Sequence, residues 1–285
     1  MPVTILDGPM GTELLARGIP TPLPGWSAHA LIDHPETVEQ IHRDYAGAGA
    51  SVHTANTFRT RRRVFPDRWQ ELARTAVRLA RRGGGPDHRV AGSIAPLEDC
   101  YRPDLSPADP GPEHAEMARV LAGAGCDVLL CETFPHVGEA LAAVQAAMDT
   151  GLETWVSFTA GPDADLLSPA QMAGAARKAV GLGVSAVLVN CVPASRMIEF
   201  VRAVLDAVGG SGGGVPIGAY ANAGTPDERM GWRSAPDAPA RYADAAEVWI
   251  EAGVTIVGGC CGTGPEHIGE LARRFGPPES SSGPD

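Results

Sequence analysis

Several features that would place this chain among membrane or nucleic-acid-binding proteins are missing from its sequence. No apolar run approaches the length of a membrane span, and the start "MPVTILDGPMG" lacks a basic, leader-like segment. Lysine occurs once, at Lys178, and the formal net charge is -11, which argues against nucleic acid or an anionic membrane as the partner. We therefore expect a cytoplasmic protein, in which six reduced cysteines favour metal binding or catalysis over disulfides.

Short apolar runs recur along the chain, and longer segments with helical spacing separate them. The runs are nearly continuous in apolar character, which is typical of parallel strands buried on both faces. They cover residues 3–6, 50–54, 89–94, 127–131, 154–158, 185–190, 215–220 and 254–258. Because a helical segment follows each run, the pattern predicts a single (β/α)8 TIM barrel over residues 1–275, with a disordered tail at 276–285. A doubly wound sheet is the alternative, but "DGPMGTELL" after the first run lacks its phosphate-binding glycine fingerprint.

Three of the six cysteines follow predicted strands on one side of the barrel. Cys191 follows the sixth run, and Cys260 and Cys261 follow the eighth, so the strand ends that carry them lie about 10 Å apart on one rim. Three thiolates around one point favour Zn²⁺, and three protein ligands leave a fourth position open, as in catalytic sites. The other cysteines are interpreted as two buried core residues, Cys126 and Cys131, and a loop thiol, Cys100.

Motifs throughout the chain resemble those of the homocysteine S-methyltransferase family, which includes the betaine– and S-methylmethionine–homocysteine methyltransferases. They are "LDGPMGTELLARG" (6–18), "NTFRT" (56–60), "VAGSIAP" (90–96), "LLCETF" (129–134), "VSF" (156–158), "VNC" (189–191) and "GGCCGT" (258–263). The paired cysteines and the Asn-Cys step are the most specific of these. The resemblance implies a (β/α)8 barrel with Zn²⁺ on Cys191, Cys260 and Cys261, where the thiol of homocysteine takes the open position.

The same resemblance implies roles for further residues. Asp7 and Glu132 match acidic positions that help to hold the amino acid's ammonium group, and amides around Gly8 and Gly11 suit its carboxylate. Asn56 and Phe58, from the "NTF" motif, complete the expected substrate-binding set. A site with three thiolates suits a cationic methyl donor, and S-methylmethionine or S-adenosylmethionine is the expected one. The partners are thus two small molecules, and the sequence makes no prediction of oligomeric state.

Departures from the family pattern leave other functions open. The family commonly reads Glu-Thr-Asn-Thr-Phe-Gly where this chain has Thr54-Ala55-Asn56-Thr57-Phe58-Arg59. The arginines at 59–63 form either a solvated loop or a recognition site for carboxylate or phosphate, so another small thiol or selenol, or another donor, is an alternative. From other classes, the alternatives are a barrel zinc hydrolase with Glu132 or Asp99 as base, and a corrinoid-partner methyl-acceptor module. The long polar connection at 221–238 is a candidate loop over the active face.

Overall fold

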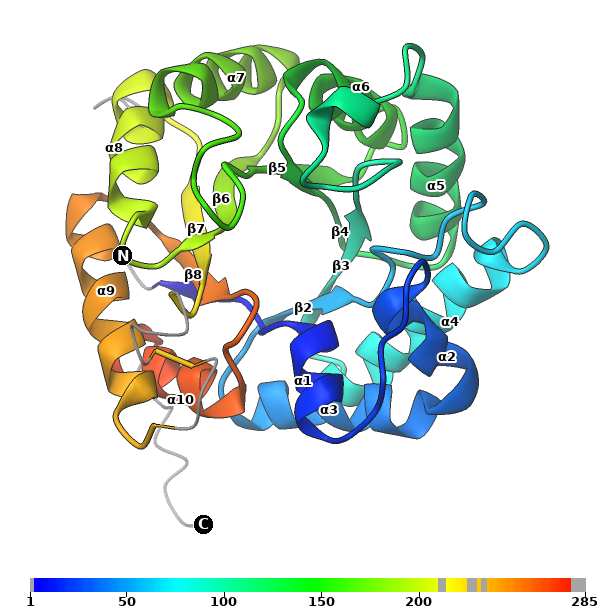
Figure 1. The fold of residues 1–285 in the computed structure, drawn as a ribbon, viewed down its shortest axis with the longest axis horizontal. Helices are drawn as coiled ribbons and strands as arrows, with labels where there is room; N and C mark the ends of the chain where they lie inside the picture. The colour runs from blue at the N-terminus through cyan, green and yellow to red at the C-terminus, as the bar shows by residue number, and fades with distance from the viewer. Residues whose placement is uncertain (1–2, 210–213, 225–229, 232–234, 278–285) are drawn as a thin grey trace.

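Eight parallel strands form the centre of the molecule (Figure 1). The computed structural model describes residues 3–209, 214–224, 230–231 and 235–277. The strands pair in the order β1-β8-β7-β6-β5-β4-β3-β2, and a bridge between Leu6 and Val52 closes the ring between β1 and β2. The predicted TIM barrel is confirmed, with strands at Thr4–Ile5 (β1), Val52–Ala55 (β2), Arg89–Ile94 (β3), Val128–Phe134 (β4), Glu153–Phe158 (β5), Ala186–Pro193 (β6), Ile217–Asn222 (β7) and Ile256–Gly259 (β8).

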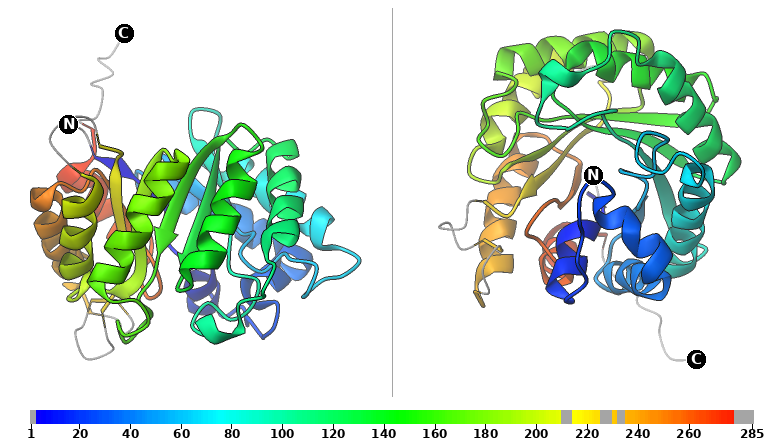
Figure 2. Two further views of the ribbon diagram at one scale, coloured as in Figure 1. Left: turned by 90° about the horizontal axis from the view of Figure 1, so that it is seen from above. Right: turned by 45° about the vertical axis from the view of Figure 1, so that its right-hand side comes forward.

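Helices surround the strands, as the side views show (Figure 2). Several begin with a proline in their first turn, where its missing N–H costs no hydrogen bond. The α7 helix also has a capping box between Ser168 and Gln171. The helices are Met10–Ala16 (α1), Ala30–Asp33 (α2), Pro35–Gly47 (α3), Trp69–Gly84 (α4), Gly111–Gly123 (α5), Val137–Met148 (α6), Pro169–Leu182 (α7), Met197–Val208 (α8), Ala238–Ala252 (α9) and Pro265–Phe275 (α10), with 3-10 turns at Trp26–His29 (η1) and Pro103–Leu105 (η2).

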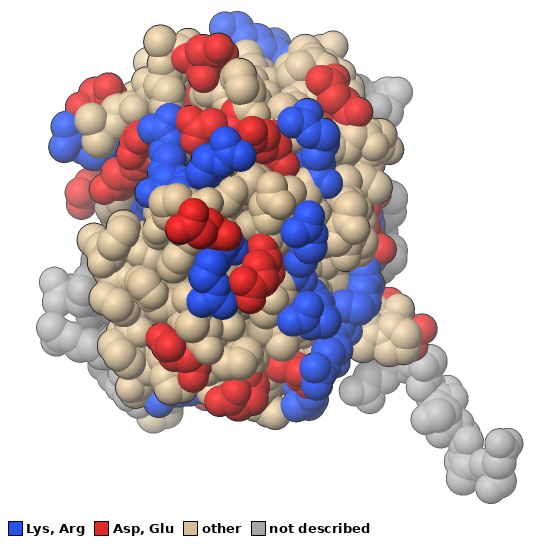
Figure 3. All heavy atoms as spheres, turned by 90° about the vertical axis from the view of Figure 1, so that its right-hand side faces the viewer, with Lys and Arg blue, Asp and Glu red and all other residues tan. Residues whose placement is uncertain are grey.

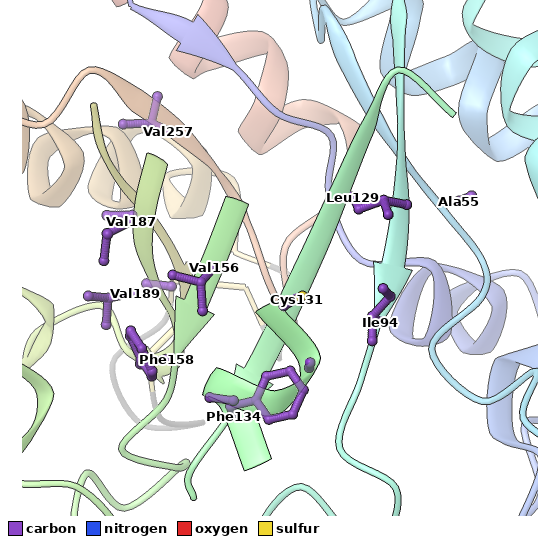
Figure 4. Packing of buried hydrophobic residues seen from close by; sticks show 14 of the residues in the cluster. Ala55, Ile94, Leu129, Cys131, Phe134, Val156, Phe158, Val187, Val189 and Val257 are labelled. Atoms are coloured by element: carbon purple, nitrogen blue, oxygen red, sulfur yellow. The ribbon is translucent and has the colours of Figure 1, made fainter. Parts of the chain in front are cut away.

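The buried apolar side chains form two clusters, one outside and one inside the ring of strands. The larger cluster joins the strands to the helices, and Figure 4 shows members of it along neighbouring strands. Cys126 and Cys131 belong to it, which confirms their interpretation as core residues. The smaller cluster takes alternate residues, such as Val128 and Leu130 of β4, and therefore fills the barrel interior.

The same alternation places polar residues inside the barrel near the carboxyl ends of the strands. These polar residues are Ser93, Glu132, Ser157, Asn190 and Tyr220. Tyr220 belongs to the interior cluster, and each of the other four lies two positions beyond a member of it. They are buried and hydrogen-bonded to one another: Tyr220 and Ser93 donate to Glu132, and Ser157 donates to Asn190. The interior thus changes from apolar to polar towards the end of the barrel where active sites occur in this fold.

The outer surface carries charges of both signs side by side, as Figure 3 shows for one face. No described helix combines the length and the apolar character that crossing a bilayer requires. Residues 278–285, most of the predicted tail, lie outside the described residues, as do 225–229 and 232–234 within the candidate loop at 221–238.

Candidate functional site

A cavity of about 490 Å³ opens at the carboxyl ends of the strands. Its lining comes from the ends of β1, β2, β4, β6, β7 and β8 and from the loop after β3. All of the site residues predicted from the sequence line this one cavity: Asp7, Gly8, Asn56, Phe58, Glu132, Cys191, Cys260 and Cys261.

The sulfur atoms of Cys191, Cys260 and Cys261 meet in this cavity. All three lie within 4.8 Å of one another, and the Sγ atoms of Cys191 and Cys260 are 3.0 Å apart. Cys191 is buried, and the other two are partly exposed to the cavity. Thiols from two strands, β6 and β8, that are separated by β7 therefore converge on one point, as the sequence predicted.

Local backbone irregularities direct the three thiols inward. Regular alternation on β6 would turn Cys191 outward, because Asn190 points into the barrel. The register shifts between Asn190 and Pro193, and Cys191 takes a left-handed conformation with φ 54°. Such backbone strain in a residue with a side chain is common at functional sites.

A glycine turn shapes the cysteine pair after β8. A Cβ atom at Gly259 would lie 2.1 Å from Oγ1 of Thr263, whose hydroxyl donates to the carbonyl of Cys260. Gly262 has φ 83°, which favours glycine. The amide of Cys260 still donates to Ala221, so the pair stays fixed to β7 while the chain turns away.

The chemistry of this cluster suits a soft divalent metal. Hydrogen bonds from the thiols of Cys191 and Cys260 lower the pKa of Cys261, which places a thiolate within the cluster. The hydroxyl of Tyr101, in the loop after β3, donates to Sγ of Cys191 at 3.3 Å. The electrostatic interaction with Cys191, together with burial, raises the pKa of Tyr101, so this hydroxyl keeps its proton and donates to sulfur. Three sulfur donors and one hydrogen-bond donor around them are the composition of a metal–thiolate centre.

Glu132 forms a second chemical group in the cavity. Its Oε1 accepts from Ser93, and its Oε2 accepts from the hydroxyl of Tyr220 at 3.0 Å. Burial raises the pKa of Glu132 to about 7, although both hydrogen bonds act in the opposite direction. A cation that enters the cavity next to this carboxyl group would favour its ionised form.

Asp7 provides a further buried carboxylate, at the end of β1. Its Oδ2 accepts from the amide of Thr54 at 2.9 Å, and Nδ1 of His42 and of His53 lie 3.7 and 4.0 Å from the same oxygen. Burial lowers the pKa of His53 to about 4, so this imidazole is neutral at pH 7. Gly8 follows directly and lines the cavity with Met10 and Gly11, in the first turn of α1, which has no side-chain cap.

Asn56 and Phe58 line the cavity but also shape its wall. The amide of Asn56 donates to the carbonyl of Ser27 at 2.9 Å, and its oxygen accepts from the Ser27 hydroxyl at 2.7 Å. Asn56 thereby holds the η1 turn. The ring of Phe58 packs edge-on against Trp26, with centroids 6.0 Å apart.

Sequence reasoning did not assign four residues to this site that the structure places in it or beside it. Tyr101 lies in a loop without periodicity, and no sequence signal connects it to Cys191, 90 positions away. Tyr220 and Ser93 could have been predicted, because each occupies a position of its strand at which side chains point into the barrel. Cys100, interpreted as a loop thiol, is buried and lines the cavity, and burial raises its pKa to about 12.

Comparison with known proteins decides the family. The family model described as homocysteine S-methyltransferase matches residues 4–275. The chain belongs to the homocysteine S-methyltransferase family. This confirms the family and the methyltransferase class predicted from the sequence.

Relatives of this family member match over nearly its whole length. Homocysteine S-methyltransferase YbgG of Bacillus subtilis is 29% identical, over 95% of this chain and 94% of the relative. S-methylmethionine–homocysteine S-methyltransferase BHMT2 of Pongo abelii is 29% identical, over 88% and 73%. The metallated crystal form of the homocysteine methyltransferase MmuM from Escherichia coli superposes with a TM-score of 0.80 at 25% identity, covering 96% of both chains.

Proposed function

We propose that this protein is a zinc-dependent S-methyltransferase that moves a methyl group from a cationic donor to the thiol of homocysteine. S-methylmethionine is the expected donor. The observation that carries the proposal is the convergence of three sulfur atoms beside two buried carboxyl groups in one cavity. The sulfurs suit a metal, and the carboxyl groups suit the ammonium group of an amino acid.

The cysteine cluster fits zinc by its donor set. Cys191, Cys260 and Cys261 would hold the ion through three sulfur donors, and a substrate thiol could then be a further ligand. When bound there, zinc lowers the pKa of a substrate thiol so that its sulfur is nucleophilic at neutral pH. The similarity of this chain to MmuM, which has been solved in a metallated form, supports a metal-dependent function.

The protein's own groups orient the acceptor. Asp7 and Glu132 bind the ammonium group of homocysteine, while N–H groups of the first turn of α1 bind its carboxylate. With the amino acid fixed in this way, its sulfur reaches the cysteine cluster. The methyl carbon of the donor then bonds to the homocysteine sulfur, and the bond to the donor heteroatom breaks with its electron pair. The products are methionine, the neutral demethylated donor and the proton that the homocysteine thiol releases when it ionises.

Charge favours an onium compound as the donor. Glu132 and Asp7 line the same cavity as the cysteine cluster, so the cavity attracts a sulfonium, and the attack itself does not need a base. Alignment of the two substrates and exclusion of water then govern the rate. The relative named for S-methylmethionine supports that donor over S-adenosylmethionine.

Metal analysis combined with a methyl-transfer assay tests the proposal. We expect about one zinc per chain and methionine formation from homocysteine and S-methylmethionine. Replacement with Cys260→Ser should remove zinc and activity, whereas Cys126→Ala, which alters a buried thiol outside the cavity, should retain both. Full zinc occupancy and normal turnover in Cys260→Ser would refute the assignment. Hydrolysis alone, or turnover only with an added corrinoid protein, would favour one of the other functions considered from the sequence.

A further inference from the structure

The arginines at 59–63 differ in what they contact. Arg61 is buried and donates to the carbonyls of Pro96 and Glu98. Arg62 pairs with Glu116 at 2.8 Å, and Arg63 pairs with Glu98 and Glu113. These three side chains hold the loop to its neighbours, so the solvated-loop interpretation applies to the exposed pair, Arg62 and Arg63.

Arg59 alone in this segment turns to the cavity. It lines the cavity wall, and among the described residues it forms no ion pair. Its Nε is buried without a hydrogen-bond partner, and its hydrogen bond from Nη1 to the carbonyl of Glu98 is long, at 3.4 Å. The guanidinium lies over the ring of Phe58, 5.4 Å from the centroid, which holds its plane in position.

A partly exposed guanidinium that faces a cavity, with its Nε buried and without a partner, is suited to bind an anion. Among the described residues that line the cavity, Arg59 carries the only permanent positive charge, and the other ionisable groups are acidic residues, tyrosines and cysteines. The cavity therefore has one end that repels anions, around Glu132 and the thiols, and one place that attracts them. The forked donors of arginine match a carboxylate in two parallel hydrogen bonds.

We propose that Arg59 binds the carboxylate of the methyl donor and so selects donors that carry one; this inference rests on the proposed methyl transfer. The ammonium and carboxylate of homocysteine share one carbon, so its carboxylate stays beside Asp7 and the start of α1. In S-methylmethionine the sulfonium and the carboxylate lie at opposite ends of the molecule. With the sulfonium at the cysteine cluster, the carboxylate is free to reach Arg59. Burial raises the pKa of Cys100, while Arg59 lowers it and Asp99 and Cys261 raise it, so Arg59 and Cys261 both lie within electrostatic reach of Cys100.

The test compares S-methylmethionine with its carboxamide, which keeps the sulfonium and the ammonium but has no anionic group. In the wild-type enzyme, kcat/KM should favour the acid by about 10- to 100-fold, as expected for a charge-assisted hydrogen-bonded pair. Arg59→Gln should lose that preference through a higher KM for the acid, with the carboxamide and the KM of homocysteine unchanged. Arg59→Lys, which keeps the charge but not the fork, should retain part of the preference.

Arg62→Gln is the matched control, because it makes the same change in the same loop outside the cavity, and it should keep the full preference. A wild-type enzyme that uses acid and carboxamide equally overturns the inference without any variant. Loss of homocysteine affinity in Arg59→Gln overturns it in favour of a role at the acceptor. Absence of methyl transfer to homocysteine from either donor would instead remove the proposed function, so the two failures are distinguishable.

Discussion

The hydrogen bond from Tyr220 to Glu132 gives a quantitative prediction for Tyr220→Phe. Only the ionised form of Glu132 attracts the ammonium group of homocysteine, and burial raises its pKa to about 7. A hydrogen bond to a charged group contributes about 1.5–3 kcal/mol, which corresponds to roughly 1–2 pKa units. Loss of the Tyr220 hydroxyl should therefore raise the pKa of Glu132 by about 1.5, because the ionised carboxylate loses a donor.

This shift predicts how the KM of homocysteine depends on pH in the two enzymes. Taking pKa values of about 7 and 8.5, the KM of Tyr220→Phe should exceed that of the wild type about 30-fold at pH 6, about 8-fold at pH 7.5 and hardly at all at pH 9.5. The titration of homocysteine itself is common to both enzymes and cancels in the ratio.

Steady-state kinetics at these three pH values, with saturating S-methylmethionine, provide the measurement. The zinc content of the two enzymes serves as the internal control, since neither Tyr220 nor Glu132 is assigned to the metal. A KM ratio that stays constant from pH 6 to 9.5 would show that the hydroxyl acts only by packing or direct contact, and would refute the electrostatic argument.

Two further predictions concern other buried groups. Glu132→Ala should raise the KM of homocysteine about 10- to 100-fold while metal content stays at the wild-type level, and an unchanged KM would remove Glu132 from the site. Burial lowers the pKa of His53 to about 4, below its unfolded value of 6.5, so its contribution to stability is present above pH 6.5 and is lost as the pH falls towards 4. In urea unfolding, this contribution should lower the free energy of unfolding of the wild type by about 2 kcal/mol between pH 7 and pH 5. The contribution should be absent in His53→Gln. Equal losses of stability in both proteins would contradict the prediction.

Strand alternation and strand order explain why much of this site was predictable. The apolar runs located every strand to within a few residues, and parallel strands bring their carboxyl ends to one rim. Glu132 lies two positions beyond the inward-facing Leu130, so its direction follows from β4 alone. The position of Cys260 after β8 likewise follows from the length of its run.

Other features depend on contacts that local pattern does not encode. Alternation would direct Cys191 away from the cavity, and only the irregular, left-handed backbone at the end of β6 reverses this. Asn56 is predicted as a substrate ligand from the "NTF" motif, and no sequence pattern shows that its amide forms hydrogen bonds at both ends with Ser27, 29 positions earlier. Arg59 and Arg62 are chemically identical in the sequence, and only tertiary packing separates a cavity side chain from a surface one.

Because β1 is short, the closure of the barrel depends on residues that also line the ligand cavity. This strand has two residues, and the ring is fastened to β2 by the Leu6–Val52 bridge, by the amide of Asp7 on Val52, and by the Asp7 carboxylate on Thr54. The junction between β1 and β2 thus includes Asp7, the residue to which the proposed function assigns the ammonium group of homocysteine. Homocysteine bound to Asp7 would therefore stabilise the pairing of β1 with β2. Substitutions that weaken the binding of homocysteine to Asp7 would also weaken the closure of the barrel.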